Sequence, residues 1–346
     1  MVREYCTRLI VFIQSTTTKV TDRVFPWNLD LKYNNKFGRL GFGSLHLNKN
    51  SGAFLKKLKK LNRDATTFVD CAPYYAGNRC FKKLENILKR DQSLNLTLAI
   101  KIGLLSRKEK GNHVSLPTQY KVYDLTKIKN LINKPCFSRC SFLFQFHQLQ
   151  YKPKTKFLIK LSESIHNNHF KGVGVANCNL RDFFWCLNKF KEHKIPFKTF
   201  QMHANIIEQK HIRQFYSLLV KHKITPVFNR ALARGALAYN SIKDDPPINS
   251  RIMTSNRVKK WLTKQKKNKL KTFWDFCDRK KINYVEFSLG YLLKRFTKSI
   301  ILIASPRKKG SENVLEKALK FRITNKKNSF AERLRLKSFP KYYFEK

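Results

Sequence analysis

Short apolar runs of β type alternate with amphipathic segments along most of the chain. Eight such runs predict buried strands, at residues 39–45, 66–72, 96–102, 141–147, 171–177, 197–203, 224–230 and 299–305. Between them, apolar residues spaced three and four apart predict helices at 54–63, 80–90, 156–168, 180–194 and 212–223. Regular alternation of buried strand and amphipathic helix is typical of parallel strands joined by right-handed crossovers.

Eight strand and helix units close into a (β/α)8 barrel of the α/β class, which is the fold we expect. A doubly wound open sheet is the alternative, but no G-x-G-x-x-G motif follows an early strand. Long loops are predicted at Ser106–Gln119 and at Asp244–Asn256 with the following KKWLTKQKKNKLK. The barrel is expected over residues 36–322, between a basic extension at 1–35 and a basic, aromatic tail at 323–346.

Polar residues stand at or next to the C-terminal end of seven of the predicted strands. They are Asp70, Lys101, His147, Asn177, Gln201, Asn229 and Ser305. In a closed barrel these strand ends converge on one mouth, where loops build binding and catalytic sites. An acid such as Asp70, taken alone, is as well explained by a turn or a helix cap. Seven polar residues at one mouth favour a site.

The charge of the chain is strongly positive. Its 72 Lys and Arg residues against 22 Asp and Glu residues leave a formal charge of +50. Such a surface attracts polyanions, and the runs KKLKK and KKWLTKQKKNKLK and the aromatic, basic tail suit phosphates and stacked bases. A lysine-rich composition inherited from a biased genome is the alternative. No RNA-binding fold signature is present, so the sequence does not support sequence-specific readout.

Cysteine usage bears on the compartment and on metal binding. The eight cysteines show no framework spacing, which is typical of a reducing compartment, so we expect a cytoplasmic or organellar protein that is not secreted. Cys136-x3-Cys140 with His147 lacks an evident fourth ligand, so no metal site is predicted. The first two dozen residues resemble an organelle transit peptide, as for the mitochondrial matrix, or form a plain basic extension. No apolar window is long enough to span a membrane.

Motifs along the chain resemble those of the aldo-keto reductase superfamily. FVDCAPYY with Gly77 and Asn78 resembles the Asp-x-Ala-x-x-Tyr-Gly signature, IKIG the strand with the catalytic lysine, and LFQFH the strand with the histidine. GVGVAN resembles a Gly-Val-Ser-Asn strand, and FQMHANII, NRALARGAL and IASPRKKGSEN resemble the Gln-x-x-x-Asn, Pro-Leu-x-x-Gly and cofactor-closing segments. The resemblance runs in order from about Gly41 to Leu319.

The resemblance implies a catalytic tetrad of Asp70, Tyr75, Lys101 and His147. Tyr75 would be the general acid that protonates a carbonyl oxygen while a nicotinamide delivers hydride. Since a free phenol has a pKa near 10, a neighbouring cation, Lys101, would be needed to lower the pKa of Tyr75. Asp70 would pair with Lys101, and His147 would orient the carbonyl.

The resemblance also implies a cofactor, NADPH or NADH. Asn177 and Gln201 match positions that hold the nicotinamide carboxamide, Lys309 a cation for the 2′-phosphate, and Asn313 an adenine contact. The remaining cofactor-binding positions that it implies are Gly43, Ser44, Asn229, Leu232 and Ser305.

Four positions depart from the pattern. Ala176 replaces the serine before the carboxamide asparagine, Phe142 the aspartate that opens the histidine strand, and Cys80 a glutamate. Asn229 stands where many members stack an aromatic ring on the nicotinamide.

Two functions therefore follow from the sequence. The first is an NAD(P)H-dependent reductase that converts an aldehyde or ketone to an alcohol. The alternative is a barrel with reduced or no activity, recruited as a structural or RNA-binding component of a ribonucleoprotein such as an organellar ribosome.

Overall fold

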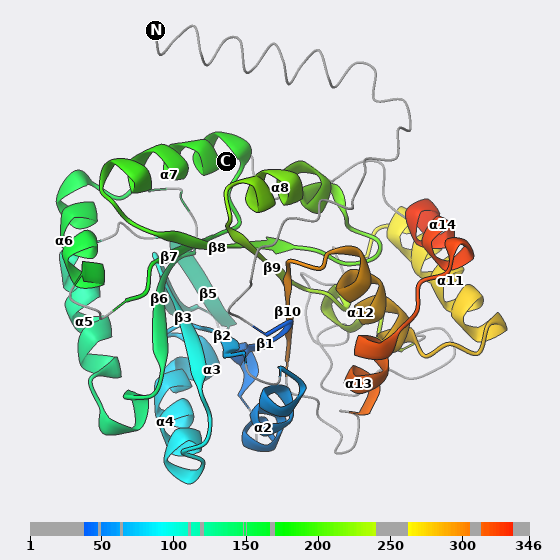
Figure 1. Ribbon diagram of the computed structural model, residues 1–346, viewed down its shortest axis with the longest axis horizontal. Helices are drawn as coiled ribbons and strands as arrows, with labels where there is room; N and C mark the ends of the chain where they lie inside the picture. Colours follow the sequence, from blue (N-terminus) through cyan, green and yellow to red (C-terminus); the bar gives the residue numbers. More distant parts are fainter. Residues whose placement is uncertain are drawn as a thin grey trace, which may run out of the picture. The chain divides into compact units, whose positions relative to one another are not determined.

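A closed parallel barrel forms the centre of the fold (Figure 1). The computed structural model describes residues 38–334, apart from 48–49, 63–64, 110–111, 118–120, 148, 150, 167–169, 240–261 and 305–312. Its barrel strands hydrogen-bond in the order β1-β10-β9-β8-β7-β6-β3-β2, and each neighbouring pair is parallel. They are β1 (Leu40–Gly43), β2 (Thr67–Cys71), β3 (Leu96–Ile102), β6 (Ser141–Phe146), β7 (Val173–Ala176), β8 (Phe197–His203), β9 (Thr225–Asn229) and β10 (Ile300–Ile303). Each lies inside a predicted run, which confirms the (β/α)8 barrel.

Helices surround this barrel on the outside (Figure 1). The five predicted helices are confirmed with small changes of their ends, as α2 (Ser51–Asn62), α4 (Cys80–Arg90), α6 (Thr155–His166), α7 (Leu180–Glu192) and α8 (Lys210–Lys221). The structure adds α3 (Tyr75–Asn78), α5 (Val122–Ile132), α11 (Lys264–Arg279), α12 (Tyr284–Arg295), α13 (Asn313–Lys320) and α14 (Asn325–Leu334). Three short 3-10 helices are η1 (Ser44–His46), η2 (Pro135–Phe137) and η3 (Ala233–Gly235).

The barrel interior is apolar at one level and polar at the next. The apolar level is a buried cluster of Phe68, Ala99, Leu143, Val227, Ile300 and Leu302. Successive strand residues point to opposite faces, so the residue two positions on faces the same side. Two positions after Phe68, Ala99 and Leu143 stand Asp70, Lys101 and Gln145, all buried. Strand periodicity thus carries these polar side chains to the C-terminal end of the interior.

The outward faces of the strands pack on the helices through phenylalanine. Phe144 and Phe146 of β6 contact Phe157 of α6 with ring centroids 5.6 and 6.2 Å apart. Phe200 of β8 stacks on Phe215 of α8 at 4.7 Å. Since aromatic side chains bury a large apolar area each, these contacts hold the helical layer on the barrel.

Three predicted segments differ from the structure or lie outside it. The loop predicted at Ser106–Gln119 is wrong over the described residues, because β4 (Leu104–Glu109) and β5 (Asn112–Pro117) pair as an antiparallel two-stranded sheet. The predicted loop through KKWLTKQKKNKLK is wrong from Lys264 onward, because Thr263 caps helix α11 by accepting from the Lys266 amide. Asp244–Asn256 and the extension at 1–35 lie outside the described residues.

The expected tail begins with a packed helix. Residues 325–334 form α14, and its Phe330, Ala331 and Leu334 are buried. Phe330 stacks on Phe276 of α11, with ring centroids 3.7 Å apart. The first part of this segment therefore belongs to the fold, because its apolar stripe finds a partner on α11.

Candidate active site

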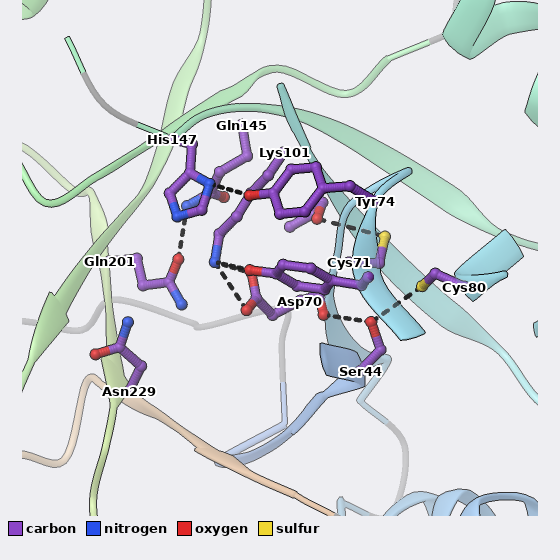
Figure 2. Close-up of polar contacts among 12 residues, drawn as sticks. Ser44, Asp70, Cys71, Tyr74, Cys80, Lys101, Gln145, His147, Gln201 and Asn229 are labelled. Atoms are coloured by element: carbon purple, nitrogen blue, oxygen red, sulfur yellow. Dashed lines mark hydrogen bonds and ion pairs between the residues drawn. The ribbon is translucent and has the colours of Figure 1, made fainter. Parts of the chain in front are cut away.

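A buried ion pair lies at the mouth of the barrel, between β2 and β3. Lys101 Nζ lies 2.6 Å from Asp70 Oδ1 and 2.8 Å from Oδ2, and it donates to Tyr75 Oη at 3.2 Å. Asp70 is 7% exposed and Lys101 is 2% exposed. Asp70 and Lys101 end neighbouring parallel strands, while Tyr75 opens the short helix α3 directly after β2. The structure therefore brings together three of the four residues of the expected tetrad, and Figure 2 shows Asp70 and Lys101 side by side.

The electrostatics at Tyr75 differ from the expectation. Burial and the negative charge of Asp70 raise the pKa of Tyr75 well above its ordinary value, whereas the sequence suggested that Lys101 would lower it. The reason is geometric, because Lys101 is closer to Asp70 than to Tyr75 and the pair is neutral as a whole. With the two charges cancelling, loss of water around the phenol dominates. Tyr75 therefore keeps its proton at neutral pH.

His147 faces the same mouth but contacts a different tyrosine. Its Nδ1 is hydrogen-bonded to Tyr74 Oη, and the two rings lie nearly parallel at an angle of 8° (Figure 2). Tyr74 and Tyr75 meet edge to face, with centroids 5.0 Å apart. Burial and the nearby charge of Lys101 hold the pKa of His147 well below its usual range. His147 is therefore a neutral imidazole that Tyr74 holds in place.

Ser44 is hydrogen-bonded to the backbone of Asp70. Its hydroxyl donates to the backbone carbonyl of Asp70 at 2.8 Å and lies 3.2 Å from Cys80 Sγ. Burial raises the pKa of Cys80 to about 11, so a neutral thiol stands where the resembled pattern has a glutamate. Ser44, expected at the cofactor, is fully buried and fixes the strand end that carries Asp70.

Two amide side chains, one on β8 and one directly after β7, each have a buried polar atom without a hydrogen-bond partner among the described residues. The buried Oδ1 of Asn177 and the buried Nε2 of Gln201 have no hydrogen-bond partner among the described residues. The backbones of Asn177 and Gln201 are joined by a hydrogen bond of 3.0 Å. A carboxamide offers one donor and one acceptor. The unpaired acceptor of Asn177 and the unpaired donor of Gln201 could hold the two ends of a carboxamide.

Gln145 decides which atom of Gln201 is available. Gln145 Nε2 donates to Gln201 Oε1 at 3.3 Å, which leaves Nε2 of Gln201 unpaired (Figure 2). Gly174, between the two glutamines in the barrel, makes room, because a Cβ there would lie 2.3 Å from Thr199 Oγ1 and 2.6 Å from Gln145 Oε1. The sequence motif contained Gln145 and Gly174, but it did not identify either as part of the site.

The other expected cofactor residues that the structure describes lie on β1, at the end of β9 and beyond it, and at the start of α13. Asn229 ends β9 and is hydrogen-bonded to His203 Nδ1, a residue that the sequence did not single out. Leu232 lies in the turn after β9, where its carbonyl accepts from the Gly235 amide at 2.8 Å. Gly43 ends β1, and Asn313 is exposed at the start of α13. Ser305 and Lys309 lie outside the described residues.

Metal-binding clusters, disulfide bonds and membrane-spanning helices are absent from the part of the chain that the structure describes. No group of three or more His, Cys, Asp or Glu side chains there could hold a metal ion. The described cysteines are free thiols. None of the described helices is both long enough and apolar enough to cross a membrane.

Comparisons with known proteins agree with the geometry. The model of the aldo/keto reductase family matches residues 38–334. No curated protein sequence matches the chain. The fold is similar to the glycerol dehydrogenase AKR11B4 from Gluconobacter oxydans, at 16% identity and a TM-score of 0.65 over 86% of this chain and 90% of that one. It is equally similar to the aldo-keto reductase AKR11C1 from Bacillus halodurans in its holo form, at 16% identity and a TM-score of 0.65 over 89% of this chain and 95% of that one. The family match spans the whole barrel with its polar mouth, and the chain belongs to the aldo/keto reductase family.

Proposed function

We propose that the protein is an NAD(P)H-dependent reductase that converts an aldehyde or ketone to an alcohol, with Tyr75 as the general acid. The observation that carries the proposal is the buried contact of Tyr75 Oη with Lys101 Nζ, backed by Asp70. A barrel with only a structural role does not need a buried ion pair beside a phenol. Apolar side chains of similar volume in place of the ion pair are often as stable or more stable.

The side chains of the site would supply the proton that the carbonyl oxygen of the substrate takes up. Tyr75 carries its proton at neutral pH, so it can donate to a carbonyl oxygen that gains negative charge. As the phenolate forms, the ammonium of Lys101 at 3.2 Å stabilises it, and Asp70 keeps that ammonium in position. In the tautomer of the neutral His147 in which Nδ1 accepts from Tyr74, the imidazole proton is on Nε2, which can donate to the same carbonyl oxygen.

The residues that would hold the cofactor are Asn177 and Gln201 at the carboxamide. When bound, the reduced nicotinamide supplies the hydride. Lys309 as partner of a 2′-phosphate rests on the sequence pattern, and it supports NADPH over NADH. The aldehyde or ketone itself would meet Tyr75, His147 and the residues around them.

Turnover of NADPH with a panel of aldehydes and ketones tests the proposal, with Tyr75→Phe as the central variant. We expect Tyr75→Phe to bind NADPH as the parent does, measured by fluorescence titration, and to lose about 10²- to 10⁴-fold in turnover, because only the transferable proton is removed. Tyr74→Phe is the comparison variant and should lose only about tenfold, since it removes the neighbouring hydroxyl, which orients His147 and transfers no proton to the substrate.

Two results would reject the proposal. Equal turnover of Tyr75→Phe and the parent would remove Tyr75 from the reaction. Absence of saturable NADPH binding by protein freed of nucleic acid at high salt would favour the alternative of a barrel recruited for a structural role.

A further inference from the structure

A positively charged groove lies between α11 and α14, which run side by side at the edge of the fold (Figure 1). Its volume is about 580 Å³. Five of its nine lining residues are cationic and none is acidic. Lys269 and Arg279 come from α11, Lys280 is the C-cap residue directly after it, and Lys326 and Arg333 come from α14. Cations are therefore much denser here than the 72 in 346 residues of the whole chain.

The floor of the groove is apolar and holds the two helices together. Phe276 of α11 and Phe330 of α14 stack with an angle of 11° between their rings. Lys269 Nζ also donates to the backbone carbonyl of Arg333 at 2.7 Å. On its far side α11 is tied to the barrel by the buried ion pair of Lys266 with Glu208 at 3.2 Å. The walls of the groove are thus built on packed elements.

The cations of the groove have no acidic partners in the part of the chain that the structure describes. Among the described residues, none of the five groove cations forms an ion pair with a carboxylate. Lysines elsewhere on the surface do find partners, as Lys89 and Lys134 do with Glu85. The acid nearest in sequence to Arg333 is Glu332, which instead contacts Arg213 and Arg295. Like charges facing each other across one groove repel, and a bound anion would relieve that repulsion.

We propose that this groove binds the phosphate backbone of single-stranded RNA. Lys269 and Arg279 are ten residues apart on α11, which at about 1.5 Å per residue is roughly 15 Å along the helix. A length of this order spans several consecutive phosphates of one strand. A groove between one pair of neighbouring helices suits one strand, and positively charged grooves are the common way of following a single-stranded backbone.

The binding would not depend on the base sequence. Phe276 and Phe330 are buried and stacked on each other, so their faces are not available for bases. Phe330, one of the aromatic residues of the basic tail, is therefore used for packing and not for stacking on bases. Contacts to phosphates remain, and these carry no sequence information.

Affinity against salt concentration, measured by fluorescence anisotropy of a labelled oligouridylate of about twelve nucleotides, tests the site. The variant Arg279→Gln/Lys280→Gln/Lys326→Gln/Arg333→Gln removes four exposed groove cations. Each phosphate contact to a single strand adds about 0.7 to the slope of log affinity against log salt, so we expect the slope to fall by about 2 to 3. The control Lys60→Gln/Lys82→Gln/Arg90→Gln/Arg181→Gln removes the same charge from exposed positions on α2, α4 and α7.

The outcomes distinguish RNA binding at the groove from binding that depends only on the total positive charge of the protein. A smaller slope in the groove variant and an unchanged slope in the control would support the proposal. Equal loss in both variants would overturn it, because affinity would then follow total charge. Tighter binding of inorganic polyphosphate than of the oligouridylate would also overturn the assignment to RNA. If the fourfold variant has a lowered melting temperature, Arg279→Gln/Arg333→Gln is measured instead, with an expected fall of the slope of about 1.4.

This inference does not depend on reductase activity, because the groove residues lie apart from the tetrad. Loss of RNA affinity with unchanged NADPH binding is the expected combination for the groove variant.

Discussion

The ion pair of Asp70 and Lys101 gives the sharpest prediction, and Lys101→Met is the change that tests it. The substitution removes the ammonium that lies 2.6 Å from Asp70 Oδ1 and leaves a carboxyl group in a site where Asp70 is 7% exposed. A lone carboxylate buried in this way costs about 3 to 5 kcal/mol of stability.

The cost of protonating the carboxyl group gives a second estimate of the stability that Lys101→Met would lose, and the two estimates agree. The carboxyl group in the variant can avoid a buried charge by taking up a proton. An ordinary aspartic acid titrates near pH 3.9, so holding its proton at pH 7 costs about 4.2 kcal/mol, and at pH 5 only about 1.5 kcal/mol. The loss of stability should therefore be about 4 kcal/mol at pH 7 and smaller by about 2 to 3 kcal/mol at pH 5. For a barrel of about 300 residues, 4 kcal/mol corresponds to a fall in melting temperature of roughly 6 °C.

Chemical denaturation of the parent, Lys101→Met, Asp70→Asn and the double variant at both pH values is the assay. The double variant Asp70→Asn/Lys101→Met should recover most of the lost stability, because no unpaired charge remains in the site. Two results would refute the reasoning. One is a loss below about 1 kcal/mol at pH 7, and the other is the same loss at pH 5 and pH 7, since either would mean that water reaches Asp70.

Three further changes probe other parts of the site. Gly174→Ala should destabilise the protein by about 1 to 3 kcal/mol in denaturant titration, because the new Cβ would lie 2.3 Å from Thr199 Oγ1; an unchanged midpoint would contradict the close packing. Tyr74→Phe should lower kcat/KM about tenfold with NADPH affinity unchanged, since His147 loses the hydrogen bond that orients it; full activity would show that another group positions the ring. Burial lowers the pKa of His211 to about 4, so the unfolded chain takes up this proton first and stability falls as the pH drops from about 6.5 towards 4. His211→Gln should reduce that slope by up to about 1.4 kcal/mol per pH unit, and an identical slope would remove His211 from the effect.

Local pattern in the sequence was enough to place the strands and the polar residues at their C-terminal ends. Each strand needs only a short apolar run, and the side chain two positions after an interior residue must face the same side. Asp70, Lys101 and Gln145 therefore stand at the polar level of the barrel as a direct result of strand periodicity. The resemblance to the family then indicated which of these residues, together with Tyr75, are expected to form one catalytic site.

The partners of these side chains were decided only in three dimensions. Tyr74 contacts His147 across 73 positions of sequence, and Gln145 contacts Gln201 across 56. No periodicity records such contacts, because they depend on how strands from separate parts of the chain meet at one mouth. The same holds for the pKa of Tyr75, since its direction depends on burial and on Lys101 lying closer to Asp70 than to the phenol. The same is true of α14. In the sequence Phe330 is one aromatic residue of a basic segment, and only the structure shows that it stacks on Phe276. Residue type and spacing follow from the chain itself, whereas distance, burial and charge balance exist only after the barrel has closed.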